Sequence, residues 1–294
     1  MQTSGKPSIN DWIKSLPLYI LPHHALSRGM MALTRIRLPW FKNWAINQFS
    51  NVFDINWSDA KKQRADEFEN FNAFFTRELR SEVRPIDAQS NVLVSPADGR
   101  VSQIGNIDAG TLLQAKGKTF TTQALLGGVG SIAAPFDEGS FTTIYLSPRD
   151  YHRLHMPCDG TLIETIYIPG RLFSVAPHTT RTIPGLFARN ERLVALFETE
   201  HGKMALVLVG AIFVSAIETV WAGLVTPPHQ TDCVRTDYRQ SSIVLKKGEE
   251  LGRFNMGSTI IALFEKNRVV WAPSLSTDSP VKMGQAIATG YASG

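Results

Sequence analysis

The sequence is poor in cysteine and has no long apolar run. Its 294 residues include only Cys158 and Cys233, which cannot form a disulfide framework, so we expect a reducing compartment. The most apolar stretch, residues 204–217 (MALVLVGAIFVSAI), is short, broken by glycine and rich in β-branched residues, which predicts a buried strand rather than a membrane-spanning helix. The N-terminus also lacks the pattern of a secretory signal.

The excess of positive over negative charge is confined to the N-terminal region. The net charge is +4, and hydrophobic residues make up 43% of the chain, as in a globular protein with a large core. Residues 1–65 contain nine basic and three acidic residues, a local charge of +6, so the remainder sums to about −2. We therefore expect any anionic partner surface to meet the N-terminal region, and we expect no nucleic-acid partner.

The first 65 residues mix aromatic and basic side chains in short helical segments. Pro17, Pro22 and Pro39 divide the region. Aromatic faces beside Lys and Arg suit helices that lie in a lipid headgroup layer, although helices packed on the protein body with a solvated basic face would show the same pattern. We predict a helical membrane-associating region over 1–65 and a catalytic domain over 66–294. Within that domain, Asp66–Asp87 has phenylalanines mostly at helical spacing and predicts a helix that faces the core.

From Val92 onward the pattern changes to short β-rich runs separated by glycine turns. Two echoes occur: Pro96–Val101 matches Pro157–Leu162, and the segment from Lys247 to Leu251 resembles that from Lys282 to Ile287. This arrangement resembles a duplicated barrel-sandwich hybrid of the biotinyl/lipoyl type, without a carrier lysine at a matching hairpin tip. The predicted fold class is α+β, with this β-rich core and N-terminal amphipathic helices.

Three groups in the β-rich region could carry chemistry: Asp98, the pair His152 and His155, and Ser258. Carboxylate, imidazole and hydroxyl are the parts of a nucleophile with an oriented base. Each also has an ordinary interpretation: Asp98–Gly99 as a turn pair, the histidines as structural residues, and Ser258 as a turn serine. His152, His155 and Cys158 have no fourth ligand nearby, so we predict no metal site.

The pair Gly257–Ser258 stands at the entrance of an apolar run, Ile260–Phe264. In a strained turn, the Ser258 hydroxyl can attack the Gly257 carbonyl carbon, because glycine has no side chain to obstruct it and tolerates unusual backbone angles. The resulting ester can lose the serine α-proton and break, and the dehydroalanine left behind hydrolyses to a pyruvoyl group and ammonia.

Six motifs together resemble phosphatidylserine decarboxylases of the bacterial and mitochondrial type. In order they are FNAFFTREL, SPADGRV, YHRLHMP, LFARNER, VGA…IETVWAG and KGEELGRFNMGST. The resemblance runs from about Phe71 to Leu263 and is weaker before it. The family cleaves itself within Leu-Gly-Ser-Thr, and here Met256 replaces the leucine, a nearly volume-conserving change.

The resemblance implies the site and the reaction. Cleavage between Gly257 and Ser258 would give chains 1–257 and 258–294, with Ser258 converted into a covalent pyruvoyl cofactor. Asp98, His155 and Ser258 would form the self-cleavage triad, and His152 would act in decarboxylation as a protonated imidazole that returns a proton to the α-carbon. Phosphatidylserine would form a Schiff base with the pyruvoyl group and give phosphatidylethanolamine and CO2. We expect a heterodimer of the cleaved chains, further paired into a dimer, peripherally bound to the cytoplasmic face of an anionic cell membrane.

Contacts with the substrate are predicted in a hydrophobic segment after residue 170. The candidates are Leu172, Phe173, Ser174 and Phe187, and core packing explains the apolar members equally well. The sequence departs from the family pattern at Ala176, where Asn is usual, and at Ser215–Ala216, where Gly-Ser is usual. Two other functions fit the residues alone: a membrane-bound β-rich binding protein with an intact chain, and a serine hydrolase that uses Asp98, His155 and Ser258, although no G-x-S-x-G elbow is present.

Overall fold

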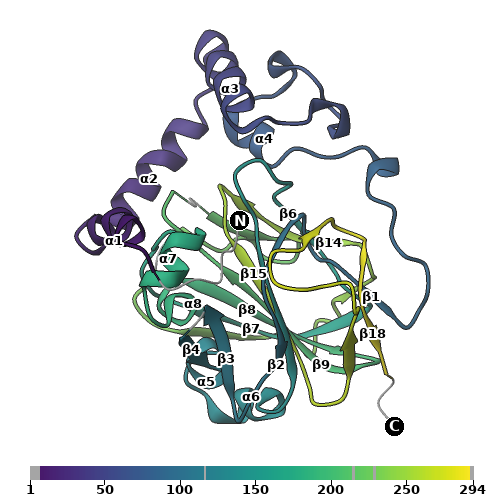
Figure 1. Ribbon diagram of the computed structural model, residues 1–294. Coiled ribbons are helices and arrows are strands. Elements are labelled where there is room, and N and C mark those ends of the chain that lie inside the picture. Colours follow the sequence, from purple (N-terminus) through teal and green to yellow (C-terminus); the bar gives the residue numbers. More distant parts are fainter. Residues whose placement is uncertain (1–6, 116, 214–215, 228–229, 292–294) are drawn as a thin grey trace.

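The computed structural model describes residues 7–115, 117–213, 216–227 and 230–291. Helices dominate the N-terminal part and recur as short turns on the β body (Figure 1). The helical segments are α1 Ile9–Ser15, η1 Leu16–Tyr19, α2 His23–Thr34, α3 Pro39–Phe53, η2 Trp57–Asp59, η3 Ala65–Glu67, α4 Phe71–Phe75, η4 Ser81–Val83, α5 Thr122–Leu125, α6 Gly130–Ala133, η5 Ala134–Phe136, α7 Pro177–Thr182 and α8 Leu186–Arg189.

Antiparallel sheets form the body that follows. The strands are β1 Val92–Val94, β2 Gly99–Asn106, β3 Thr111–Ala115, β4 Lys118–Thr121, β5 Ser140–Tyr145, β6 Arg153–His155, β7 Gly160–Ile168, β8 Arg192–Thr199, β9 Gly202–Val209, β10 Ala216–Thr219, β11 Gly223–Leu224, β12 Val234–Asp237, β13 Val244–Leu245, β14 Glu250–Asn255, β15 Thr259–Phe264, β16 Val269–Trp271, β17 Pro280–Val281 and β18 Ala286–Gly290. Over the described residues, the largest sheet has the order β12-β7-β8-β9-β15-β5-β2-β17, and β13 also pairs with β7. The α+β fold with antiparallel sheets and N-terminal helices is thus confirmed.

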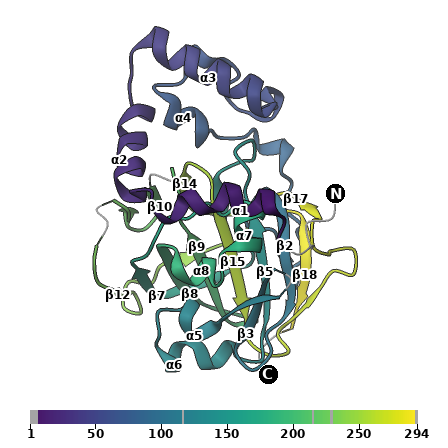
Figure 2. The same cartoon turned by 60° about the vertical axis from the view of Figure 1, so that its left-hand side comes forward.

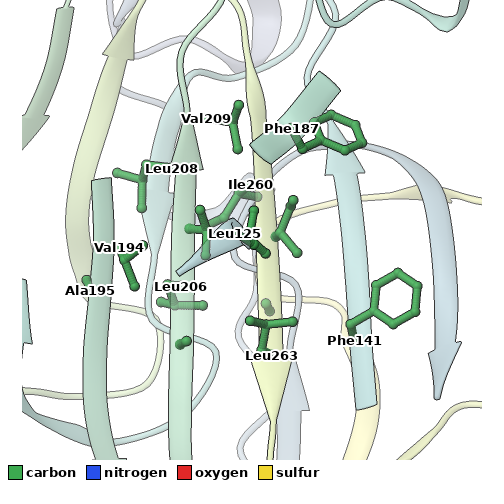
Figure 3. Packing of buried hydrophobic residues seen from close by; sticks show 14 of the residues in the cluster. Leu125, Phe141, Phe187, Val194, Ala195, Leu206, Leu208, Val209, Ile260 and Leu263 are labelled. Carbon is green, nitrogen blue, oxygen red and sulfur yellow. The ribbon is translucent and has the colours of Figure 1, made fainter. Parts of the chain in front are cut away.

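Strand β15 lies in the middle of this sheet. It pairs with β5 along one edge and with β9 along the other, over all six of its residues. Every residue of β15 is buried, and Ile260 and Leu263 belong to the main hydrophobic core shown in Figure 3.

The predicted buried strand at 204–217 corresponds mainly to the end of β9. Among the described residues, no helix has the length and apolar character needed to cross a membrane.

The sequence echo between residues 96–101 and 157–162 has a structural counterpart. The Asp98 carboxylate accepts a hydrogen bond from Met283 N at 2.9 Å, and the Asp159 carboxylate accepts one from Lys247 N at 2.8 Å. In both places the next residue is a glycine in the left-handed region, Gly284 with φ +85° and Gly248 with φ +81°. The structure therefore matches Gly248 with Gly284, and Lys247 with Met283. This alignment differs by one residue from the sequence comparison, which matched Lys247 with Lys282.

The N-terminal helices dock on the body at two separate places. Helix α1 lies beside α7, where Asp11 pairs with Arg181 at 2.7 Å and the Thr182 hydroxyl donates to the Ser15 hydroxyl at 2.7 Å. Both views place α3 together with α4 at the opposite end of the N-terminal arm (Figures 1 and 2). The single helix predicted over Asp66–Asp87 was wrong: α4 covers only five residues, because the chain leaves the helix at Thr76 to follow the surface of the body.

Candidate active site

The chain turns between β14 and β15 through Met256 and Gly257. Met256 has φ +91°, which is unfavourable for a residue with a side chain, whereas Gly257 lies outside the left-handed region. The strain predicted for this turn therefore falls on the residue before the glycine. A non-glycine residue in such a conformation costs on the order of 1–3 kcal/mol and persists only where its surroundings enforce it.

Ser258 is completely buried at the start of β15. Its carbonyl oxygen accepts a hydrogen bond from Leu146 N at 2.9 Å. Its hydroxyl has no hydrogen-bond partner anywhere in the described chain. A turn serine normally bonds water or a nearby backbone group, and a buried unpaired hydroxyl costs about 1–3 kcal/mol. The geometry therefore favours a reactive role for Ser258 over a turn role.

His152 places a bare ring nitrogen next to Gly257. Its Nδ1 donates to the Asp150 carbonyl at 2.8 Å, which leaves the lone pair on Nε2, and Nε2 has no partner among the described residues. A methyl group built on Gly257 would lie 3.8 Å from Nε2. Burial, helped by the charge of Arg77, lowers the pKa of His152 to about 3, so the ring is a neutral base in the uncleaved chain.

This neutral state differs from the protonated His152 expected for the decarboxylation step. The structure is that of the uncleaved chain, in which desolvation of the fully buried ring opposes its protonation. His152 must therefore gain a proton from another group before it can return one to the substrate.

His155 has the same tautomer but a different environment. Its Nδ1 donates to the Gly248 carbonyl at 2.8 Å, and its Nε2 accepts the hydroxyl of Tyr151 at 3.0 Å. Burial raises the pKa of Tyr151, so this hydroxyl keeps its proton. Burial also lowers the pKa of His155, and both of its ring nitrogens are already engaged.

Asp98 is held by Arg84 rather than by a histidine. Its carboxylate accepts from Arg84 Nε at 2.9 Å and from Met283 N at 2.9 Å, and Arg84 also pairs with Asp59 at 3.1 Å. His155 and Asp98 are nevertheless neighbours, because His155 N donates to the Pro96 carbonyl at 2.8 Å. The structure thus gathers the predicted residues in one region without hydrogen bonds that link Asp98, His155 and Ser258. Sequence reasoning missed Arg84, which fell near the end of the helix predicted over Asp66–Asp87.

Helix α4 packs against His152 and against the turn that contains Met256 and Gly257. The Phe75 ring lies 4.1 Å from the His152 ring, centroid to centroid, and Asn72 Nδ2 donates to Asn255 Oδ1 at 2.8 Å. Met256 packs against an apolar cluster, here called the phenylalanine cluster, formed by Ile46, Ile55, Ala65, Phe68, Phe71, Phe74 and Phe75. Sequence analysis assigned these aromatic residues to the core in general, because spacing alone does not show what they cover.

A cavity of about 590 Å³ opens beside the site. Tyr145, which pairs with Thr259 across β5 and β15, lines it together with Asp98 and Asp150. From the segment after residue 170 the lining residues are Val175, Pro177 and Thr180.

None of the four predicted substrate contacts lines this cavity. Leu172, Phe173 and Phe187 are about 1% exposed and pack in the core, and Ser174 is partly buried. Phe173 packs against Tyr19 and His23 of the N-terminal region.

The remaining sequence features have plain structural positions. Ala176 caps the N-terminus of α7, and Ala216 begins β10, while Ser215 lies outside the described residues. Burial raises the pKa of Cys158 to about 12. Among the residues that the structure describes, no group of three His, Cys, Asp or Glu side chains is arranged to hold a metal ion.

Comparison with known proteins shows the family of this chain. The family model for phosphatidylserine decarboxylase matches residues 71–289, and a second model, described as PSD, matches residues 13–54. The chain is 51% identical over 281 residues to the phosphatidylserine decarboxylase proenzyme of Stutzerimonas stutzeri, with 95% of each chain covered. It is 53% identical over 272 residues to that of Pseudomonas putida strain F1, with 92% and 95% covered, and 50% identical over 282 residues to that of Azotobacter vinelandii, with 95% and 98% covered. These similarities extend beyond the motifs at both ends, and the chain belongs to the phosphatidylserine decarboxylase family.

Proposed function

We propose that this chain is a proenzyme that cuts itself between Gly257 and Ser258 and then converts phosphatidylserine into phosphatidylethanolamine and CO2. The observation that carries the proposal is the buried, unpartnered Ser258 hydroxyl after a strained Met256 and beside the bare nitrogen of His152. A serine hydrolase would need its hydroxyl open to substrate, and the complete burial of Ser258 argues against that alternative.

Self-cleavage begins when Ser258 Oγ loses its proton to a base and attacks the Gly257 carbonyl carbon. The C–N bond breaks as the freed amine takes up a proton, which leaves an ester. Removal of the Ser258 α-proton then expels the Gly257 carboxylate and ends the continuous chain. Family likeness assigns the triad role to Asp98 and His155. For that role, the His155 ring must exchange the Tyr151 hydroxyl for Ser258 Oγ, whereas His152 Nε2 already faces the turn.

The site fits a pyruvoyl group at position 258. The group would replace the Ser258 side chain, whose hydroxyl forms no hydrogen bond among the described residues, beside the apolar residues of the central strand β15. When present, it supplies a ketone that draws electrons from the substrate α-carbon as CO2 leaves.

His152 is proposed to carry a proton during turnover. The amine of phosphatidylserine arrives as an ammonium and must lose a proton before it can react. Neutral His152 Nε2 can take that proton and later return it to the α-carbon. His152 therefore becomes protonated during the reaction and does not have to be protonated before the substrate binds. The Asp150 carbonyl holds the required tautomer throughout.

The two chains are proposed to remain together after the cut. Residues 258–294 would contribute β15, whose backbone hydrogen bonds to β5 and β9 do not depend on the Gly257–Ser258 bond. We further propose that the β body is a duplicated barrel-sandwich hybrid. The matched Asp98 and Asp159 turns, each closed by a backbone N–H before a left-handed glycine, support that assignment.

The N-terminal helices are proposed to place the enzyme peripherally on the cytoplasmic face of the membrane. Large apolar side chains are exposed along α1 and the turn after it, with Ile9 at 81%, Ile13 at 62% and Ile20 at 86%. Trp40 and Trp44 are exposed on α3, opposite its buried residues Ile46 and Ser50. Such apolar surface suits insertion into the boundary between headgroups and acyl chains.

Intact-mass measurement together with a decarboxylation assay tests the function. The purified chain should separate into 1–257 and a short chain from position 258, and the mass of the short chain should show a ketone in place of the serine amine. CO2 should be released from phosphatidylserine in mixed micelles. A single uncut chain without CO2 release would contradict the proposal and favour a binding protein.

A further inference from the structure

A second and smaller cavity is lined partly by residues between positions 54 and 84 and partly by residues of the β body, among them Asp98. It has a volume of about 240 Å³, and its lining includes Arg77, Arg149, Asp150, Tyr151 and Lys282. It shares Asp98, Arg149, Asp150 and Lys282 with the larger cavity, so the two meet at these residues. Asp150 and Tyr151 directly precede His152, and the small cavity is therefore next to the proposed reaction centre.

Arg77 is the most unusual residue of this lining. It is only 5% exposed, and its Nη2 donates to the Arg149 carbonyl at 3.2 Å. Its Nε and Nη1, which together carry three N–H donors, have no hydrogen-bond partner within the described chain. The Arg77 guanidinium also lies over the ring of Phe74, with Cζ 5.5 Å from the ring centroid. Arginine keeps its charge in proteins, and buried N–H donors without hydrogen-bond partners are costly. A ligand anion would satisfy these donors.

The acidic residues of the cavity are largely committed elsewhere. Asp59 and Asp98 both bind Arg84, and Asp150 accepts from the backbone N–H and hydroxyl of Ser147 at 2.7 and 2.6 Å. By contrast, no ion pair involves Arg77, Arg149 or Lys282 among the described residues, and the latter two are exposed at the cavity edge. The lining thus has four acidic and four basic residues and no net formal charge, so an anion would be attracted by the unpartnered donors of Arg77 rather than by an excess of positive charge.

We infer that Arg77 is the centre of a subsite for the phosphodiester of the lipid substrate. The inference rests on the proposed function, because it names a substrate contact of the same site. Phosphatidylserine carries two anions near its amine, the phosphodiester and the carboxylate. The phosphodiester is joined to the α-carbon through one methylene and one oxygen, so it must lie close to His152 when the amine reacts. Arginine matches phosphate oxygens well in geometry and charge.

The carboxylate is the poorer match for Arg77. It leaves as neutral CO2, and a charged hydrogen bond to it would stabilise the ground state more than the transition state. The phosphodiester keeps its charge throughout, so a bond to it contributes equally at both stages. This bond should therefore act on KM for phosphatidylserine, and kcat should stay nearly unchanged in Arg77→Lys, which keeps the positive charge that lowers the pKa of His152.

The test compares two soluble competitors that differ in the phosphate. Glycerophosphoethanolamine carries amine and phosphodiester, and ethanolamine carries the amine alone. Both are titrated against phosphatidylserine decarboxylation by the self-cleaved wild type, Arg77→Gln, Arg77→Lys and the control Arg80→Gln. Arg80 belongs to the same segment, but its side chain is 43% exposed and pairs with Glu82.

In the wild type and Arg80→Gln, glycerophosphoethanolamine should inhibit much more strongly than ethanolamine. Arg77→Gln should lower that preference about tenfold or more and raise KM, because it removes charge-assisted hydrogen bonds. Arg77→Lys should fall between them, since it keeps the charge and loses the planar donor set. Intact mass confirms that each variant has two chains and the ketone.

An unchanged preference in both Arg77 variants overturns the inference, as does a loss of kcat at constant KM. If Arg77→Gln stays uncut, Arg77→Lys provides the comparison, and failure of both to cleave assigns Arg77 to processing or folding and overturns the inference. An inactive wild type contradicts the proposed function itself, whereas an active wild type with an unchanged preference contradicts only the role of Arg77.

Discussion

Ser258 is the residue on which the proposed processing depends. Ser258→Ala removes the only hydroxyl at the bond to be cut, so we expect a full-length chain with no ketone and no decarboxylase activity. Because the Ser258 hydroxyl forms no hydrogen bond among the described residues, the uncut variant should be at least as stable as an unprocessed precursor. Denaturing electrophoresis and intact mass provide the measurement. Two fragments from this variant would remove Ser258 from the mechanism.

The two histidines can be separated by their effects on cleavage and on turnover. We expect His155→Ala and Asp98→Ala to slow self-cleavage, because a serine nucleophile needs a base and the base needs an orienting group. His152→Ala should still cleave, at least in part, and lose turnover. Time courses of cleavage after synthesis in vitro, followed by assays of the cut fraction, measure both effects. An uncut His152→Ala together with a normally cut His155→Ala would reverse the roles, as the position of His152 beside Gly257 allows.

The buried His152 also predicts a dependence of stability on pH. Its pKa is about 3 in the folded chain against an ordinary value of 6.5, so the unfolded chain binds more protons between these values. Stability should therefore fall as the pH drops below about 6.5, by at most about 1.4 kcal/mol per pH unit from this residue. Urea denaturation of uncut Ser258→Ala, with and without His152→Gln, isolates the contribution. Equal pH slopes in the two chains would show that His152 does not titrate in this way.

At the residue scale, the sequence predicted which candidate groups lie near one another better than it predicted their contacts. Motif likeness placed Asp98, His152, His155 and Ser258, and the structure brings them into one region. The ion pair of Arg84 with Asp98 and the orphaned guanidinium of Arg77 could not be foreseen, because both depend on where an irregular segment crosses the body. Three of the four predicted substrate contacts, Leu172, Phe173 and Phe187, are buried in the core, and hydrophobicity alone does not distinguish a cavity wall from an interior.

Among the elements, α4 combines a packing role with a position over the site. Phe75→Ala should lower the free energy of unfolding of the uncut Ser258→Ala chain by about 3–5 kcal/mol, because it removes a buried ring from the phenylalanine cluster and from the face of His152. Trp44→Ala, which removes a ring that is 59% exposed, should change stability by only about 0.5 kcal/mol. Chemical denaturation measures both. Similar losses in the two variants would contradict the assigned packing.

Elements differ in how far the sequence predicts them. The apolar run before Gly210 and the run after Ser258 appear as β9 and β15, because long buried strands carry a strong hydrophobic signal. The phenylalanine-rich segment from Asp66 failed as a helix, since its aromatic residues are buried against α3 and the β14–β15 turn instead of along one continuous face. Tertiary contacts there outweigh local periodicity.

For the molecule as a whole, the structure reduces the contribution to membrane binding that we expect from charge attraction, relative to that from insertion of apolar side chains. Of the nine basic residues before position 66, Lys42 is buried, and Arg37, Lys61 and Arg64 pair with acidic residues. The local charge of +6 therefore overstates the attraction that reaches a lipid surface. The exposed apolar side chains remain, so insertion should contribute more than charge.

We expect Trp40→Ser combined with Trp44→Ser to weaken binding to anionic vesicles severalfold. Val270→Ser, a comparably exposed apolar residue on β16, is the control and should bind as the wild type does. Co-sedimentation over a range of salt concentrations measures binding, and much of it should survive high salt because charge attraction is screened within about 10 Å at 0.1 M. Equal binding by the double variant would place the membrane contact elsewhere. Deletion of the whole region is a poorer test, because it would strip Ile46 and Ile55 from the phenylalanine cluster.

The central position of β15 predicts that the two chains of the processed protein cannot refold once they are separated. With the proposed cut, the central strand of the largest sheet would form while the polypeptide is continuous and would only then become part of a separate chain. After denaturation, the short chain would have to find the gap between β5 and β9 by diffusion, with six apolar or β-branched residues free to associate with one another. Heat inactivation of the processed enzyme should thus be irreversible where that of the uncut chain is not, and its useful lifetime is set by the rate of opening rather than by an equilibrium.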